Sequence, residues 1–331
     1  MSFILNDWSR IVENAEWGPL RLMRCVSHGN YIYVTGGNPN AFGGRTDNVY
    51  RSLDGITWEL LTDNPGWAAR AAHGFLYYGG KFWVFGGSDA AAGFLNDVWS
   101  SDDCITWNQE TAAAPWSTRH EFAYCIHDGK IYLSGGFSGA GYKNDVWSFD
   151  GTTWNQECVN IDVAIVGIRE HVMSSYLGVL WIYGGNTGFA LSTNNIYRSA
   201  DNGVNWTDVG NAAWGVRREH QLLISPYSTP IAPLAIVGGY NAIAGSSYND
   251  VWQTTNGTTF TEIAQINAYT PRSDFGFVHH NGYAYIIGGT SDTGGTILGD
   301  VWRAKAERNI SFTGSPRSGR TPLRVDFTLE F

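Results

Sequence analysis

Arginine recurs six times along the chain at spacings close to fifty residues, and histidines or acidic residues stand beside most of these arginines. The six arginines are Arg21, Arg70, Arg119, Arg169, Arg218 and Arg272. The neighbouring side chains include His73, Glu121, His171, His220 and Asp274. If the arginines met around one axis, their guanidinium groups would bind an anionic ligand through paired hydrogen bonds. The alternative interpretation is that an arginine present in every repeat braces the contacts between repeats.

Three histidines come from three different repeats and raise the question of metal binding. His73, His171 and His220 would form an imidazole site if they converged. Histidines in such positions also serve as hydrogen-bonded scaffold. We expect the scaffold role, and therefore neither a metal nor any other cofactor.

An aromatic residue precedes most of the arginines by three or four positions. These residues are Trp17, Trp67, Trp116, Trp214 and Tyr269. Exposed aromatic rings stack on sugar faces, so one hypothesis is a glycan-binding face; the other is packing between repeats. The fourth repeat has no such ring and carries an apolar segment at residues 160–167 instead, which is a candidate contact patch.

Pairs of glycines show which elements must position these side chains. The pairs are Gly36-Gly37, Gly86-Gly87, Gly135-Gly136, Gly184-Gly185, Gly238-Gly239 and Gly288-Gly289. A period near fifty residues is typical of propeller blades. Side chains that recur in every repeat are then scaffold candidates, and function is expected where the repeats differ.

Each repeat contains four short runs rich in β-forming residues. In the second repeat they lie at residues 70–75, 81–87, 96–99 and 105–107, separated by Gly, Asp, Asn and Ser. A hydrophobic strand that ends in Gly-Gly, followed by two aromatic residues about seven positions apart, resembles the kelch repeat. The resemblance covers residues 5–304 and implies an all-β, six-bladed propeller with four antiparallel strands per blade.

The last repeat lacks its fourth strand, and the N-terminus supplies a candidate. Residues 8–12 (Trp-Ser-Arg-Ile-Val) match residues 58–62 (Trp-Glu-Leu-Leu-Thr). We therefore predict that the first strand closes the last blade and removes an open sheet edge. The propeller domain is predicted at residues 1–306.

Three turns resemble the Asp-box of sialidases and other propellers. They lie at residues 52–58, at residues 199–206, and at Ser100, Asp102, Thr106 and Trp107. The physical role of such a turn is to cap amides with Asp, to place Gly at positive φ and to anchor a strand with Trp. The resemblance also implies a sialidase-like, glycan-acting enzyme as an alternative function, although the Arg-Ile-Pro signature is missing.

Composition limits the classes of partner. The net charge is −9 and only four lysines are present, which disfavours nucleic acid. We expect no membrane insertion, because no segment is long and apolar enough, and no signal peptide. The four cysteines have no Cys-x-x-Cys spacing; buried thiols are expected, with a Cys125–Cys158 disulfide left open.

The C-terminal segment, residues 307–331, leaves the repeat and resembles the opening of a PKD-type, immunoglobulin-like domain. Residues 308–331 have a net charge of +2, which leaves −11 on the remainder. A basic arm on an acidic body favours docking within or between chains. The candidate assembly residues are Arg317, Arg320, Leu323, Val325 and Phe327.

These observations together favour a non-enzymatic binding or structural propeller, because no complete catalytic set of residues is present. The expected partners are other protein subunits, including copies of this chain, and the expected location is an extracellular surface or a virion. A glycan-binding module and a sialidase-like or other glycan-acting enzyme are the alternative hypotheses.

Overall fold

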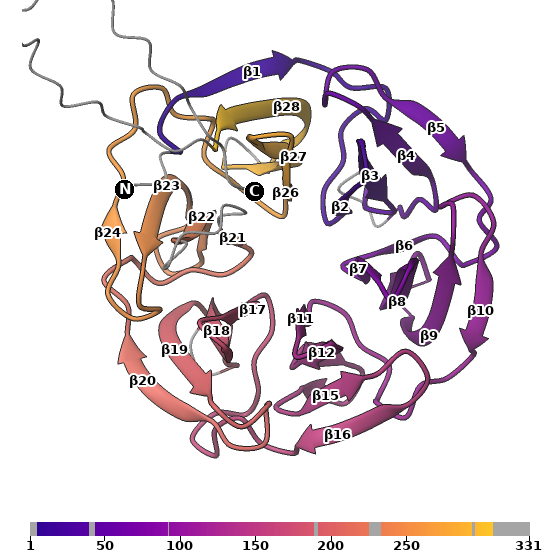
Figure 1. Ribbon diagram of the computed structural model, residues 1–331. Coiled ribbons are helices and arrows are strands. Elements are labelled where there is room, and N and C mark those ends of the chain that lie inside the picture. Colours follow the sequence, from indigo (N-terminus) through magenta and orange to yellow (C-terminus); the bar gives the residue numbers. More distant parts are fainter. Residues whose placement is uncertain are drawn as a thin grey trace, which may run out of the picture.

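Six β-sheets stand around a central axis like the blades of a propeller (Figure 1). The computed structural model describes residues 5–39, 44–91, 93–188, 191–224, 233–292 and 295–306. Within these residues every regular element is a strand. The chain therefore adopts the all-β, six-bladed fold that its repeats predicted.

Each blade is a four-stranded antiparallel meander, with its first strand beside the axis and its last at the rim. Blade 1 contains β2 (Arg24–His28), β3 (Tyr31–Thr35), β4 (Val49–Ser52) and β5 (Glu59–Thr62). Blade 2 contains β6 (Arg70–Ala71), β7 (Gly74–Tyr78), β8 (Lys81–Asp89), β9 (Phe94–Ser101) and β10 (Asn108–Thr111). Blade 3 contains β11 (Ala123–His127), β12 (Lys130–Ser134), β15 (Val146–Phe149) and β16 (Trp154–Cys158), with the small hairpin β13 (Phe137–Ser138) and β14 (Gly141–Tyr142).

The second half of the chain repeats this plan. Blade 4 contains β17 (Val172–Tyr176), β18 (Val179–Gly185), β19 (Thr193–Ser199) and β20 (Thr207–Asn211). Blade 5 contains β21 (Gln221–Ile224), β22 (Leu234–Asn241), β23 (Ser246–Thr254) and β24 (Thr261–Glu262). Blade 6 contains β25 (Arg272–Ser273), β26 (Gly276–His280), β27 (Tyr283–Ser291) and β28 (Ile297–Lys305).

The N-terminal strand closes the ring. β1 (Trp8–Val12) pairs antiparallel with β28, opposite Ala304 at its first residue, and becomes the rim strand of blade 6. The Trp8 ring is buried and meets Tyr269 edge to face at 5.2 Å. Closure by the first strand is therefore confirmed.

The paired glycines let neighbouring blades approach each other. Gly184 has a φ of +58°, and a Cβ there would lie 2.7 Å from Cε1 of His220 in the next blade. Gly36 meets His73 in the same way. Because both the backbone conformation and the space exclude a side chain, the glycine recurs at every joint.

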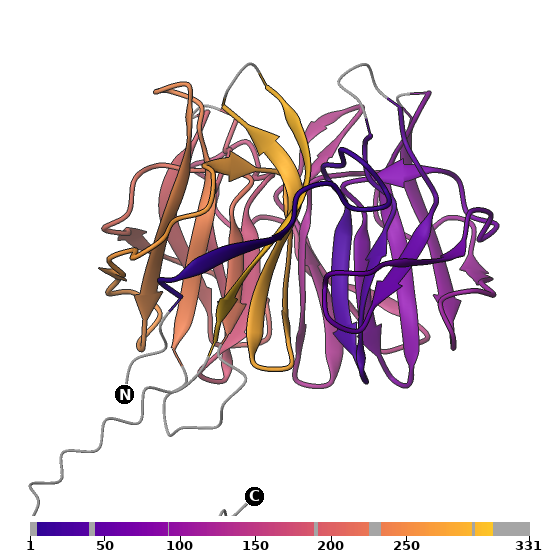
Figure 2. The same ribbon diagram turned by 90° about the horizontal axis from the view of Figure 1, so that it is seen from above.

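The meander sorts the connections onto two faces (Figure 2). We call one the loop face: it carries the loops after the glycine pairs and the loops that lead into each new blade. The opposite hairpin face carries the tight turns, such as the one in which the Asp54 carboxylate accepts the amides of Ile56 and Thr57. In blade 2 the capping residues are Ser101 and Asp103, one position later than the sequence suggested, with Cys104 at a φ of +62°.

Several predicted features lie outside the described residues. Residues 307–331, with the candidate assembly residues Arg317, Arg320, Leu323, Val325 and Phe327, are among them. The boundary of the propeller domain at residue 306 therefore stays a prediction.

The cysteines are all free thiols, so the Cys125–Cys158 disulfide does not form. Within the described ranges there is no helix that is long and apolar enough to cross a membrane.

Candidate functional site

Four arginines are locked into the joints between blades. Arg119 is fully buried; its guanidinium donates to both carboxylate oxygens of Asp145 at 2.6 and 2.8 Å and to the carbonyl of Gly135. The same arrangement holds for Arg70 with Asp97, Arg217 with Asp250 and Arg272 with Asp300. A guanidinium whose donors are taken by its own blade has no capacity for an external ligand.

The aromatic residues three positions earlier cover these buried arginines. Trp67 lies 5.5 Å from the Arg70 guanidinium and Trp214 lies 5.4 Å from that of Arg217. The rings of Trp67, Trp116, Trp214 and Tyr269 are at most 2% exposed, and Trp17 is half-buried. The hypothesis of an exposed stacking platform is therefore wrong for the four buried rings, because each one packs inside a joint.

The six arginines predicted as one ring belong to two different repeat positions. The joint position is held by Leu20, Arg70, Arg119, Ile168, Arg217 and Arg272. Arg21, Arg169 and Arg218 follow it by one residue, at what we call the flanking position. An alignment on the Arg-Glu-His tripeptide that blades 4 and 5 share matches Arg169 with Arg218. It thereby overlooks Arg217, which holds the joint position of blade 5.

The chain carries an internal signal for the correct alignment. Where the joint position is arginine, its partner in the third strand is aspartate, as in Asp97; where it is Leu20 or Ile168, the partner position is Asn48 or Asn195. In addition, the joint arginine precedes the first glycine of its blade by 16 residues in blades 2, 3 and 6. In blade 5 the same interval is 21 residues, so a count back from the glycine pair does not find the joint arginine of that blade.

The three histidines lie in separate joints and do not converge. Nε2 of His73 is 2.9 Å from the Thr35 hydroxyl of blade 1, and Nε2 of His171 is 2.8 Å from the Ser134 hydroxyl of blade 3. His220 lies against Gly184 of blade 4. Burial lowers the pKa of all three, that of His171 to about 3, so each ring is neutral. The described residues contain no His, Cys, Asp or Glu group arranged to hold a metal ion.

A belt of backbone hydrogen bonds surrounds the channel at the loop face. Its members occupy the residue after the flanking position, which we call the mouth position: Leu22, Ala72, Glu121, Glu170, Glu219 and Asp274. All six have φ between 53° and 57°. The amides of the mouth residues of blades 1 to 5 each donate to the carbonyl of the mouth residue in the preceding blade, for example Glu170 to Glu121 at 2.9 Å. The left-handed conformation thus turns each blade edge toward its neighbour.

Side chains at the flanking and mouth positions form alternating ion pairs, which we call the charged arc. The Arg169 guanidinium lies 2.7 Å from Glu121 and 3.5 Å from Glu170. Arg218 lies 3.0 Å from Glu170 and 3.6 Å from Glu219. On the far side of blade 6, Asp274 and Arg21 approach to 3.4 Å and complete the arc. The arginines are 20–27% exposed, unlike the joint arginines.

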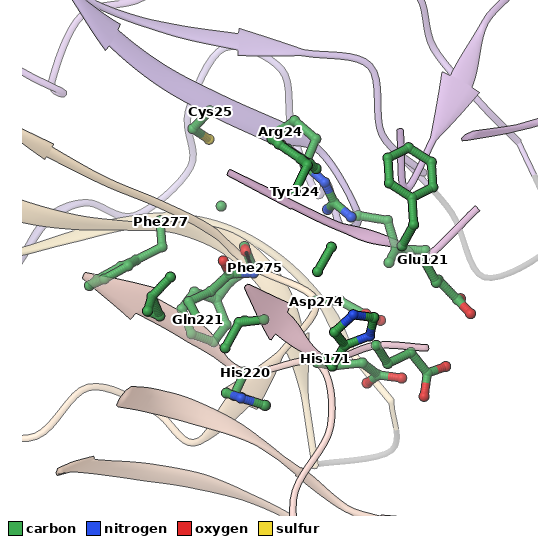
Figure 3. A pocket seen from close by; sticks show the side chains of 18 of the residues that line it. Arg24, Cys25, Glu121, Tyr124, His171, His220, Gln221, Asp274, Phe275 and Phe277 are labelled. Carbon is green, nitrogen blue, oxygen red and sulfur yellow. Dashed lines mark hydrogen bonds between the residues drawn. The ribbon is translucent and has the colours of Figure 1, made fainter. Parts of the chain in front are cut away.

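A cavity of about 210 Å³ lies in the channel below the arc (Figure 3). Its wall combines mouth carboxyls with apolar side chains such as Met173 and Phe275. Arg24 reaches from blade 1 toward blades 2 and 3, donates to the His73 carbonyl at 2.9 Å and hydrogen-bonds Tyr124. Arg24 could not be predicted from the repeats, because no other blade carries an arginine at the equivalent position.

A second hollow of about 270 Å³ opens on the loop face above blades 5 and 6. Arg21, Arg218, Ser273 and Asp292 are among its lining residues. Glu219 and Asp274 line both this outer hollow and the channel cavity. The two carboxyls therefore mark the passage between them.

Burial and repulsion disfavour negative charge at this passage. Burial raises the pKa of Asp274 well above its usual range, and the Glu219 charge raises it further. Burial also raises the pKa of Glu219, against the lowering effect of Arg218. The site thus contains two adjacent acidic groups that a nearby positive charge would stabilise.

Comparison with known proteins agrees with this architecture. A ring of six blades, each a four-stranded antiparallel meander with paired glycines at its joint, places the chain in the class of six-bladed β-propellers. Residues 23–225 match the family model of the KLHDC2/KLHL20/DRC7 Kelch-repeats domain. The chain belongs to the kelch-repeat family.

A solved structure gives the same fold. The structure of YjhT superposes with a TM-score of 0.69 at 16% identity, over 88% of this chain and 96% of that chain. At this identity the likeness concerns the fold alone. No curated protein matches the sequence.

Proposed function

We propose that this chain is a non-enzymatic protein-binding propeller that works through its loop face. Kelch propellers generally mediate protein interactions. In a meander of this kind the loop-face connections vary most between blades, whereas the joints repeat. The surface that differs between blades is therefore the surface on which a specific partner is recognised.

The observation that carries the proposal is the apolar loop of blade 4. Val159, Val163 and Val166 are 67%, 90% and 50% exposed. The loop is nevertheless anchored: the amide of Ile161 and the carbonyl of Asp162 hydrogen-bond Asn144. An ordered loop that presents three valines to solvent is a candidate protein contact.

The test compares two faces of the molecule. The partner is first isolated by cross-linking the tagged full chain in its native source, and binding of the purified pair is then measured. We expect Val163→Asp with Val166→Asp to weaken binding by about tenfold or more, because charges at the centre of an apolar contact lose burial. Leu53→Asp is the control, since Leu53 is 57% exposed on the hairpin face. Equal binding by both variants would place the contact elsewhere.

The proposal extends to assembly at an extracellular surface or in a virion. Its support is the basic segment 307–331 on an acidic body, as the charges of the sequence indicate. Light scattering of the full chain and of a chain that ends at residue 306 measures the solution mass. Assembly by the full chain alone supports an assembly arm, whereas two monomers would refute it.

Part of the residues on which the alternative functions depended is buried. A glycan-binding module relied on exposed rings, but Trp67, Trp116, Trp214 and Tyr269 are buried. A glycan-acting enzyme relied on the Asp-box turns and on the arginines, of which Arg70, Arg119 and Arg272 donate within their own blades. The other three, Arg21, Arg169 and Arg218, are held in ion pairs at the channel mouth. We therefore keep protein binding as the proposed function.

A further inference from the structure

The charged arc follows a rule from blade to blade. The flanking arginine of one blade sits between the mouth carboxylate of the preceding blade and that of its own blade. Arg169 joins Glu121 to Glu170 in this way. Arg218 joins Glu170 to Glu219. Two successive mouth carboxylates thus form a seat for one guanidinium, and the molecule shows this seat filled twice.

The rule is broken at blade 6. The next pair of mouth carboxylates is Glu219 and Asp274, and the flanking residue between them is Ser273. The short Ser273 side chain hydrogen-bonds Glu219 but brings no positive charge. Arg21 approaches Asp274 from the opposite side, at 3.4 Å. The seat between blades 5 and 6 therefore lacks an arginine at its own flanking position, and its two carboxyls are contacted from either side, Glu219 by Arg218 and Asp274 by Arg21.

The space that an arginine would need is present at this point. The outer hollow of about 270 Å³ is lined by Ser273, Glu219 and Asp274 together with Arg21 and Arg218, and it opens on the loop face. A side chain that enters from the loop face would reach Glu219 and Asp274 before it reached the channel cavity.

We infer that the Glu219–Asp274 seat binds the guanidinium of an arginine side chain presented by a protein partner. This inference rests on the proposed protein-binding function and names the chemistry that the loop face recognises. The guanidinium would complete the alternation of charges around the mouth, with paired hydrogen bonds to carboxylates as at the neighbouring seats. Lysine fits less well, because a single ammonium cannot bridge two carboxylates with the same planar geometry.

Small probes test the seat in the full-length protein. Saturation-transfer NMR compares N-acetyl-argininamide with its neutral isostere N-acetyl-citrullinamide. We expect the arginine probe to bind and Glu219→Gln to weaken it by about tenfold, because one charged partner is removed. Equal signals from the arginine and citrulline probes would overturn the inference.

Ser273→Arg is the sharpest variant, because it fills the seat from within the chain, as Arg169 and Arg218 do in their blades. We expect it to abolish binding of the arginine probe. Ser273→Ala is the matched control; it leaves the seat open and retains binding. Undiminished binding by Ser273→Arg would overturn the inference. If that variant does not fold, the double variant Glu219→Gln with Asp274→Asn replaces it in the test. Retained binding of the arginine probe by the double variant would overturn the inference.

Two sources of the arginine are distinguished by solution mass. Segment 307–331 contains Arg317, Arg320 and Arg324, so a second copy of this chain is one source. In that case the full chain self-associates and Ser273→Arg makes it monomeric. If the partner is a different protein, the full chain stays monomeric and still binds the probe. Failure of the seat leaves the valine test of the proposed function unaffected.

Discussion

Arg119 and Arg169 occupy adjacent repeat positions in neighbouring blades, yet their side chains meet different surroundings. Arg119 is enclosed by its own blade and held bidentately by Asp145. Arg169 reaches into the channel mouth and shares two carboxylates. Successive side chains of an extended segment point to opposite sides, so one position separates a structural arginine from a partly exposed one.

Removing one partner of a buried arginine–aspartate ion pair should lower the free energy of unfolding. Asp145→Asn leaves the Arg119 charge buried without its carboxylate, and we expect a loss of about 3–5 kcal/mol in the free energy of unfolding. The double change Arg119→Ile with Asp145→Asn copies the Ile168 and Asn195 pair of blade 4. We expect it to recover at least half of the loss. Urea denaturation of the full double-mutant cycle measures the coupling, and additive losses would refute it.

The free energy of unfolding depends on pH through the carboxyl groups at the mouth position. Because burial raises the pKa of Glu219 and Asp274, the folded chain keeps protons that the unfolded chain has released. This stabilisation is complete below about pH 4 and is lost as pH rises through the raised pKa values.

The sign of this dependence can be measured. Relative to the unaltered chain, Glu219→Gln with Asp274→Asn should gain free energy of unfolding as pH rises from about 4 to about 8, since the variant has no such protons to lose. Denaturation at several pH values measures the difference. A difference that stays constant with pH would contradict the assignment.

The strand that ends in two glycines is the element on which each joint depends. Gly184 and Gly185 have φ of +58° and +103°; Gly184 faces His220 of the next blade, and Gly185 packs against His171 of its own blade. The residue just before the pair contacts the side chain that packs against the first glycine. Thr35 hydrogen-bonds His73 in this way. The recurring pattern is therefore a packing unit that spans two blades.

A pair of alanine substitutions separates crowding from backbone strain. Gly184→Ala would place a Cβ 2.7 Å from His220 and 2.9 Å from the Arg217 carbonyl. We expect a loss of at least about 2 kcal/mol, because strain and overlap add. Gly178→Ala also has positive φ, +75°, but nothing within 4 Å. It should cost only about 1 kcal/mol. Equal losses, measured by thermal denaturation, would show that crowding contributes nothing.

The blades of the ring differ from one another at the joint position and beside the mouth position. Blades 1 and 4 carry an aliphatic residue at the joint position, and the other blades carry arginine. One residue after the mouth position, blades 2, 4 and 5 have histidine, namely His73, His171 and His220, and blade 1 has Met23. Blades 3 and 6 both have phenylalanine, Phe122 and Phe275. The two blades without a buried ion pair therefore stand opposite each other across the channel.

Ring closure makes the N-terminus part of the global core. Trp8 and Trp58 occupy equivalent rim positions and are 2% and 4% exposed. We expect Trp8→Ala to cost about 3–5 kcal/mol, as much as Trp58→Ala in mid-chain, because both leave a large cavity. Calorimetry with the two variants measures this. A loss for Trp8→Ala far below that for Trp58→Ala would mean that the terminal strand frays from the ring.

The sequence by itself determined the number of blades, their four-strand plan and the closing strand. These features follow from local signals, such as the glycine pairs and the Trp8–Trp58 correspondence, which depend on backbone conformation and hydrophobic periodicity.

Only the tertiary structure decided which arginines are buried, which rings are covered and which carboxyls meet at the mouth. Arg217 and Arg218 are adjacent in sequence, but one is fully buried and the other is partly exposed. The lack of an arginine at Ser273 can be recognised only in the fold, because Glu219 and Asp274 are 55 residues apart in sequence but line the same two cavities. Such contacts depend on the packing of neighbouring blades around the axis, which no single repeat encodes.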